Sequence, residues 1–283
     1  MSQTGASWPV ILVPVGTNED ALDGCLAALD AGTPHGTRVW LADDAQAGPR
    51  GLALIRHWLG TTRLQAAHTR RSQPLGEAAH LEQALQACGN ADVVVLASDA
   101  RPVPGWLAQL TACLASDAAI ATATPWCNAG EVAAWPRIGE IVALPDAPGR
   151  LADACTHLPA DYPPLPSAVA HAVLLRGSAR VAAGGVDSAS YQSWYAALID
   201  LSLRMAGLGG RNVLCDNAFV VRDAESAPQA GDLDALAVRW PAWHARLADC
   251  LMHDPLLPQR QRLQHALQAV ERVPPQPDLF VTP

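Results

Sequence analysis

Two groups of aspartates in the N-terminal half stand where their side chains could bind a polar ligand. Asp43 and Asp44 follow the apolar segment 38–41, and Asp99 follows the β-branched run Asp92–Leu96. These runs predict buried strands, and the helical periodicity between them predicts a mostly parallel sheet. Open α/β sheets bind their ligands beyond the carboxyl ends of the strands. We therefore expect the carboxylates to flank a polar ligand, which could carry a metal ion.

The composition restricts the chemistry. All 19 basic residues among the 283 are arginines, set against 27 acidic residues, which gives a formal net charge of -8. A chain without lysine can form neither a lysine Schiff base nor a P-loop. Its acidic balance argues against nucleic acid as a partner. If the chain binds a diphosphate, the positive charge must come from arginine or from a metal ion.

The cysteine pattern and the apolar runs bear on metal binding, disulfides and targeting. The seven cysteines are scattered and form no CxxC pair, so neither a zinc site nor a disulfide framework is predicted. No apolar run approaches the about 18 residues that a membrane span needs, and the N-terminus shows no signal-peptide pattern. A reduced, cytoplasmic location is the resulting expectation.

Strand and helix patterns alternate along most of the chain. Segment 126–166 is rich in proline and glycine and predicts a long excursion with little regular structure. We expect a domain over 1–225 and a helical extension over 226–283 that packs on it and ends in a frayed, proline-rich tail. The expected strands are 9–15, 38–41, 61–67, 92–96, 168–175 and 212–221, and the expected late helices are 194–206, 233–250 and 258–273.

A series of short motifs resembles a known family. Their order and spacing, from about residue 9 to residue 222, are similar to family 2 glycosyltransferases, especially the bacterial rhamnosyltransferase-like branch. The resemblance implies an α/β protein with the GT-A (Rossmann-like) fold, a mostly parallel central sheet flanked by helices. The motifs are Val13–Thr17, Leu41–Asp44, Val93–Asp99, Pro104–Leu107, Thr124–Gly130, Trp135-Pro136, Tyr162–Ala168, Gly184–Asp187 and Asp200–Arg204.

The same resemblance implies an activity and a set of binding residues. The resemblance implies transfer of a sugar, with inversion at its anomeric carbon, from a nucleotide-diphosphate sugar to a saccharide or lipid-linked acceptor in cell-surface polysaccharide synthesis. Asp44 matches the carboxylate that accepts a nucleobase N–H, and Asp99 matches a metal ligand. The positions implied to bind the donor are Pro14, Gly16, Thr17, Asp44, Asp99 and Arg222.

The sequence departs from the family pattern at the catalytic positions. The acidic pair that holds the family's base corresponds to Ala197 and Leu198, and the metal-binding element keeps a single carboxylate, Asp99. Arg222 stands where the family often has a histidine as a further metal contact. The resemblance implies Mn²⁺ or Mg²⁺, but these two departures weaken that expectation because an arginine does not bind a cation.

Three hypotheses follow. In the first, the chain is an active transferase with Asp200 or Asp187 as its base and with Arg222 stabilising the diphosphate. In the second, the fold persists without catalysis, as a module that binds a nucleotide-sugar or a partner transferase. A nucleotidyltransferase is the third, and the absence of lysine and of a glycine-rich phosphate loop disfavours it.

Each candidate carboxylate or arginine also has a structural alternative. Asp44 and Asp99 could be turn residues, and Asp187 could cap the segment that follows it. Asp200 could form an ion pair with Arg204, one helical turn along. Arg222 could face solvent.

The histidine and tryptophan candidates have structural alternatives too. His171 lies in an apolar run and is more typical of a core histidine than of a ligand. Trp126, Trp135 and Trp194 could form a platform on which a sugar stacks, although burial is the expected role of at least two of them.

Overall fold

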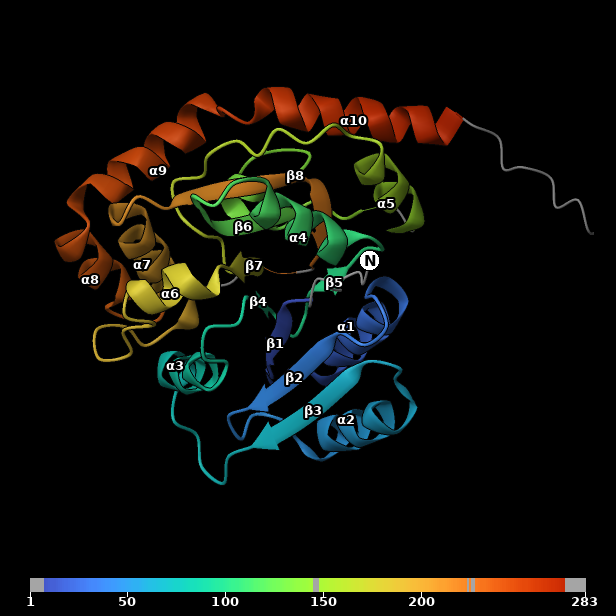
Figure 1. The fold of residues 1–283 in the computed structure, drawn as a ribbon, viewed down its shortest axis with the longest axis vertical. Coiled ribbons are helices and arrows are strands. Elements are labelled where there is room, and N and C mark those ends of the chain that lie inside the picture. Colours follow the sequence, from blue (N-terminus) through green and yellow to red (C-terminus); the bar gives the residue numbers. More distant parts are fainter. Residues whose placement is uncertain (1–7, 145–147, 223, 225–226, 273–283) are drawn as a thin grey trace, which may run out of the picture.

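The computed structural model describes residues 8–144, 148–222, 224 and 227–272. It contains one eight-stranded sheet in the order β3-β2-β1-β4-β7-β6-β8-β5. Figure 1 shows this sheet with helices on both sides. The strands are β1 (Val10–Pro14), β2 (Arg38–Asp43), β3 (Gln65–Arg70), β4 (Val93–Leu96), β5 (Arg101–Pro102), β6 (Ile120–Cys127), β7 (Ala172–Leu175) and β8 (Arg211–Val221).

The α/β architecture is confirmed, with a mixed sheet in which most strands run in the same direction and two, β7 and β5, are reversed. Strands β3, β2, β1 and β4 run parallel, and so do β6 and β8. Strand β7 is antiparallel to both of its neighbours, and β5 is antiparallel to β8. Strand direction is a tertiary property, so the apolar run at 172–175 predicted a strand without predicting its orientation.

Helices cover both faces because alternate residues of the central strands point to opposite sides. Ile11 and Val13 of β1 pack into the cluster that contains the buried faces of α1, α2 and α4. Val10 and Leu12 pack into the cluster that contains α3 and α7. These helices are α1 (Glu19–Gly32), α2 (Pro49–Thr61), α3 (Glu77–Ala87), α4 (Trp106–Ser116) and α7 (Trp194–Gly207), with the short α6 (Gly177–Ala182) before α7.

Two elements differ from the sequence-based expectation in the middle of the chain. Strand β6 is fully buried, although Pro125 interrupts its sequence pattern; the proline sits at a register shift against β8, where a missing N–H is tolerated. The segment 126–166 contains the short helix η1 (Glu131–Ala133) and helix α5 (Pro148–Thr156), which buries one apolar face.

The C-terminal region is helical, as expected, with one helix divided into two. Helix α8 (Asp232–Arg239) ends before α9 (Pro241–His253), because Pro241 biases Trp240 away from the helical conformation. Helix α10 (Leu257–Arg272) packs against α5 and runs across the top of the view in Figure 1. The expected tail lies outside the described residues, and the domain boundary at 225 stays a prediction.

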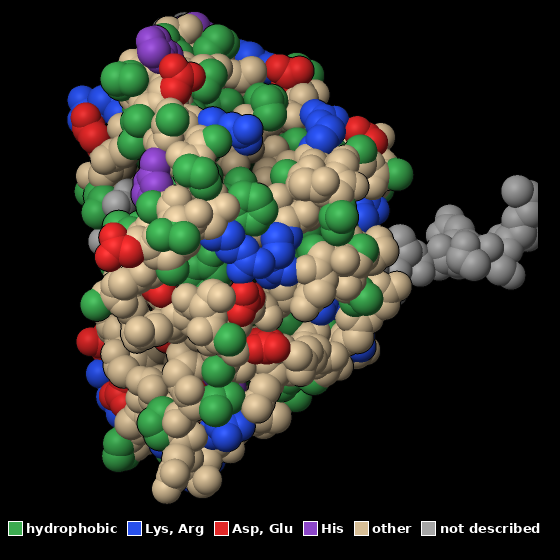
Figure 2. Space-filling model, turned by 90° about the vertical axis from the view of Figure 1, so that its left-hand side faces the viewer, with side chains coloured by type: hydrophobic (Ala, Val, Ile, Leu, Met, Phe, Trp, Pro, Cys, Tyr) green, Lys and Arg blue, Asp and Glu red, His purple; other side chains and the backbone are tan. Residues whose placement is uncertain are grey.

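The described helices include none that is both long enough and apolar enough to span a bilayer. Figure 2 shows the side of the molecule on which α8 lies in Figure 1. Acidic, basic and hydrophobic side chains are interspersed on this face rather than segregated by charge.

Arginine forks connect elements that are distant in sequence. The guanidinium of Arg176 donates from Nε to the Ile120 carbonyl at 2.6 Å, and that of Arg180 donates from Nη1 to Leu85 O at 2.8 Å. Arg260 of α10, 2% exposed, donates from Nε to Ala134 O at 2.7 Å and from Nη2 to Val132 O at 2.6 Å. One rigid side chain thus satisfies several buried carbonyls.

The buried fork of Arg260 gives a stability prediction. Its guanidinium also pairs with Asp254 and lies 5.1 Å from the ring centroid of Trp126. Arg260→Lys keeps the charge but cannot reproduce the fork, so we expect the free energy of unfolding to fall by about 2–4 kcal/mol. Arg50→Lys is the matched control, since Arg50 pairs with Asp20 at the surface. Equal thermal midpoints for both variants would contradict this account of Arg260.

Candidate functional site

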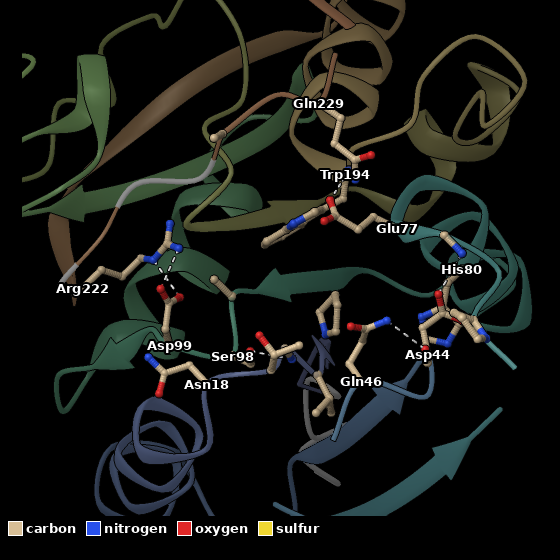
Figure 3. A pocket seen from close by; sticks show the side chains of 18 residues that line it. Asn18, Asp44, Gln46, Glu77, His80, Ser98, Asp99, Trp194, Arg222 and Gln229 are labelled. Carbon is tan, nitrogen blue, oxygen red and sulfur yellow. Dashed lines mark hydrogen bonds and ion pairs between the residues drawn. The ribbon is translucent and has the colours of Figure 1, made fainter. Parts of the chain in front are cut away.

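A pocket of about 480 Å³ opens at the carboxyl ends of β1, β2 and β4. This volume is in the range of small-molecule sites. Figure 3 shows the pair of Asp99 and Arg222 at one end and Asp44 with His80 at the other. The described lining is Pro14, Val15, Gly16, Thr17, Asn18, Asp44, Gln46, Pro74, Gly76, Glu77, His80, Ala97, Ser98, Asp99, Trp194, Arg222, Ala227 and Gln229.

All six positions that the sequence suggested for donor binding line this one pocket. They are Pro14, Gly16, Thr17, Asp44, Asp99 and Arg222. They come from the ends of β1, β2, β4 and β8, which the sheet brings to one edge. Neither of the two suggested catalytic residues, Asp200 and Asp187, belongs to the described lining.

The loop after β1 is held close to the loop after β4. The backbone N–H of Gly16 donates to Ser98 Oγ at 2.9 Å. A Cβ atom added at Gly16 would lie 2.9 Å from the same oxygen, so a larger residue would displace the Ser98 hydroxyl and disturb this hydrogen bond. Glycine at this position therefore allows the two loops to meet in the pocket lining.

Asp44 organises the loop that precedes α3. Its Oδ1 accepts the N–H of Leu75 and its Oδ2 accepts the N–H of Gly76, both at 2.8 Å. Gly76 has φ +100°, a conformation that favours glycine, and Glu77 follows it as the first residue of α3. The turn role expected of Asp44 thus coexists with its place in the pocket wall.

Asp99 and Arg222 form a two-pronged ion pair. Arg222 donates from Nε to Asp99 Oδ1 and from Nη2 to Oδ2, each at 2.8 Å. The side chain of Arg222 is 6% exposed and that of Asp99 is 26% exposed. The alternative in which Arg222 faces solvent is therefore wrong.

The main chain of Arg222 is held as firmly as its side chain. Its N–H donates to Asn128 Oδ1 at 2.8 Å, and Asn128 Nδ2 donates to its carbonyl oxygen at 2.6 Å. Asn128 is buried just beyond β6. The guanidinium thus enters the pocket from a fixed point on the sheet.

The residues at this end of the pocket do not fit a divalent cation. Both oxygens of Asp99 already accept hydrogen bonds from a guanidinium, whose charge repels a cation. The part of the chain that the structure describes contains no group of three His, Cys, Asp or Glu side chains arranged to hold a metal. Hard cations need several oxygen ligands. This end of the pocket therefore presents the guanidinium of Arg222 rather than a set of free oxygen ligands.

Two histidines near the pocket are kept neutral by burial. Burial lowers the pKa of His80, although the negative charge of Asp44 opposes this shift. Burial, aided by the positive charge of Arg222, lowers the pKa of His171 to about 3. His171 Nε2 lies 2.8 Å from the Pro125 carbonyl, to which a neutral ring can donate, while its buried Nδ1 has no partner within the described chain. His171 is a core residue, as expected.

Asp200 is a buried hydrogen-bond centre rather than a group at the pocket. It is 0% exposed and accepts from Arg204 Nε at 2.8 Å, which confirms the alternative of an ion pair along the helix. It also accepts from Trp240 Nε1 at 2.9 Å and from Tyr191 Oη at 3.3 Å, and Arg239 Nε lies 3.2 Å away. These contacts join α7 to α8.

The neighbouring positions match this structural role. Asp187 accepts a hydrogen bond from Arg239 Nη1 at 2.7 Å and from Ser190 Oγ at 2.9 Å. Ala197 and Leu198, where the family pattern places its acidic pair, are both 0% exposed in the core around α7. Acidic side chains would meet apolar neighbours there.

Of the three candidate tryptophans, one reaches the pocket. Trp126 and Trp135 are buried in the cluster under α10, while Trp194 lies at the start of α7 and lines the pocket. The pocket is also lined by four residues that the sequence patterns did not indicate, Gln46, Glu77, His80 and Gln229. The break at Pro74–Gly76 before a helical segment could have indicated Glu77 and His80, since a helix that begins at a sheet edge faces the ligand.

Comparisons with known proteins point to a fold. No protein-family model matches the sequence, and no curated protein matches it. Among solved structures, the chain is similar to GalNAc-T7 with UDP, GalNAc and Mn²⁺, with a TM-score of 0.62 and 14% identity over 94% of this chain and 55% of that one. It thus spans about half the length of GalNAc-T7.

Two further structures support the same fold. The mannosyltransferase PcManGT from Pyrobaculum calidifontis, in complex with GDP-Man and Mn²⁺, gives a TM-score of 0.59 and 17% identity over 94% of this chain and 79% of that one. S. aureus TarS gives a TM-score of 0.51 and 11% identity over 93% of this chain and 43% of that one. The chain therefore has the α/β fold of GT-A glycosyltransferases, with a mixed sheet flanked by helices.

Proposed function

We propose that this chain is a glycosyltransferase that moves a sugar from a nucleotide-diphosphate donor to a saccharide or lipid-linked acceptor, with inversion at the anomeric carbon. One observation carries the proposal. The strand ends of a GT-A fold bring Gly16, Asp44, Asp99 and Arg222 to a single pocket of ligand size. The placement follows the general rule for α/β sheets and supports donor binding there.

The lining offers a division of tasks. Trp194 presents an aromatic surface on which a ring of the donor can stack, between the Asp44 end and the Arg222 end. An inverting transfer also needs a base that removes the acceptor proton. Glu77 is an exposed carboxylate of the lining, and its Oε2 accepts from Trp194 N at 3.4 Å. We assign the role of this base to Glu77. Asp200 instead supports the fold.

A second function is favoured by a specific feature of the core. Ala197 and Leu198 are buried at the positions where the family pattern has its acidic pair. A module that binds a nucleotide-sugar, or a partner transferase, without turnover would keep this pocket and lose that pair. The two functions share donor binding and differ in turnover.

A ligand screen followed by an assay separates them. Thermal shift against UDP-, GDP- and dTDP-sugars identifies the donor, and hydrolysis or transfer of that donor is then followed with the product anomer assigned by NMR. Binding with turnover supports the transferase. Binding without turnover over a broad acceptor panel supports the module, and no binding of any nucleotide-sugar contradicts both.

Trp194 gives the first prediction for the bound state. Trp194→Ala should weaken binding of the selected donor by about three- to tenfold, because it removes the stacking surface. Trp194→Phe keeps an aromatic ring and should keep most of the affinity. Isothermal titration measures both, and equal losses for the two variants would contradict stacking.

The two carboxylates should respond in opposite ways. Glu77→Gln should lower kcat by about 10²-fold or more with little change in the thermal midpoint, as expected for loss of a general base. Asp200→Asn leaves Arg204 without its anionic partner and Arg239 with Asp187 alone, so we expect a loss of about 3 kcal/mol in the free energy of unfolding.

Steady-state kinetics together with thermal unfolding measure these effects. A large loss of kcat in a fully stable Asp200→Asn variant would instead make Asp200 the base. An unchanged kcat in Glu77→Gln would remove Glu77 from the reaction.

A further inference from the structure

Binding a diphosphate in this pocket poses a charge problem. The described lining contains the carboxylates of Asp44, Glu77 and Asp99 and a single guanidinium, that of Arg222. Burial lowers the pKa of His80, so its ring adds little positive charge at neutral pH. Within the described lining, the positive charge available to an anionic ligand is therefore that of Arg222.

Arg222 already holds an anion in the geometry that a phosphate would use. Two parallel N–H···O bonds of 2.8 Å join its Nε and Nη2 to the two oxygens of Asp99. A guanidinium edge binds carboxylate and phosphate oxygens with the same two-pronged match. The carboxylate of Asp99 thus occupies the place of a ligand oxygen pair.

The two partners differ in how firmly they are held. Asn128 fixes the backbone of Arg222 on both sides, and the side chain of Arg222 is 6% exposed. Asp99 lies in the loop between β4 and β5, and its side chain is 26% exposed. A ligand entering from solvent therefore meets Asp99 as the more accessible partner and Arg222 as the fixed one.

We propose that Asp99 competes with the ligand for Arg222. When the ligand binds without a divalent metal, its diphosphate displaces Asp99 from the guanidinium of Arg222. The inference deepens the proposed function, since it rests on a nucleotide diphosphate entering this pocket. Asp99 holds the buried guanidinium in place beforehand and limits affinity for anions that cannot replace both of its hydrogen bonds.

This role and a metal-ligand role for Asp99 predict opposite effects of one substitution. A metal ligand is required for binding, so its removal weakens the complex. A competitor opposes binding, so Asp99→Asn, which keeps the shape and removes the charge, should strengthen it. The sign of the change in affinity therefore distinguishes the two roles.

Isothermal titration with inorganic pyrophosphate in EDTA tests the inference directly. We expect the wild-type chain to bind, Asp99→Asn to lower the Kd by about two- to fivefold, and Arg222→Gln to raise it at least about tenfold. Arg222→Lys keeps the charge without the fork, so its Kd should lie between those of the wild type and Arg222→Gln. Thermal unfolding confirms that each variant is folded at the temperature of the titration.

Asp117→Asn is the matched control. Asp117 pairs with Arg211 at 2.8 Å outside the pocket lining, so the same chemical change there should leave the Kd unaltered. Weaker binding by Asp99→Asn, or no binding by the wild type and Asp99→Asn in EDTA, would overturn the inference.

Either result leaves the proposed function separately testable. Nucleotide-sugar binding that requires Mn²⁺ would support the proposed function while the inference fails. Pyrophosphate binding of the expected pattern, with no nucleotide-sugar bound, would support the anion site while the proposed function fails.

Discussion

The side-chain cations of this chain, apart from histidine, are all guanidinium groups, and much of the structure follows from where those groups are placed. A guanidinium stays charged and needs up to five acceptors, so a buried one must be surrounded by carbonyl or carboxylate oxygens. Arg180 and Arg260 donate to backbone carbonyls, although Arg180 Nε has no partner among the described residues. Arg204 and Arg222 meet this need with aspartates. The same chemistry therefore connects the elements and supplies the positive charge of the pocket.

In the pocket, the carboxylates bind groups of the protein itself. Asp99 follows a buried strand, where a metal ligand is expected in this fold, yet its two oxygens bind Arg222. Asp44 binds the backbone of the loop before α3. Asp99 and Asp44 each position a neighbour that lines the pocket, Arg222 and Gly76 respectively, so the pocket is preorganised by an ion pair and a turn.

Sequence patterns predicted the local parts of this arrangement and left out the parts that depend on distant partners. The apolar run of β4 and the polar residues after it indicated one edge of the sheet, and the pocket lies there. Strand β3 was misplaced because none of its residues is buried and it lacks an apolar signal, and β6 was missed because of Pro125. The role of Asp200 depends on Trp240, which lies 40 residues further along, between α8 and α9, and no local pattern reveals that contact.

In the proposed mode of binding, Arg222 is released by Asp99 and binds the diphosphate of a nucleotide-sugar. The most direct test is a crystal structure of the chain with its selected donor, grown in EDTA. In that crystal, we expect diphosphate oxygens within about 3 Å of Arg222 Nε and Nη2, with Asp99 turned away from the guanidinium. A donor bound with the Asp99–Arg222 pair intact, or with its diphosphate at the Asp44 end of the pocket, would contradict this mode of binding.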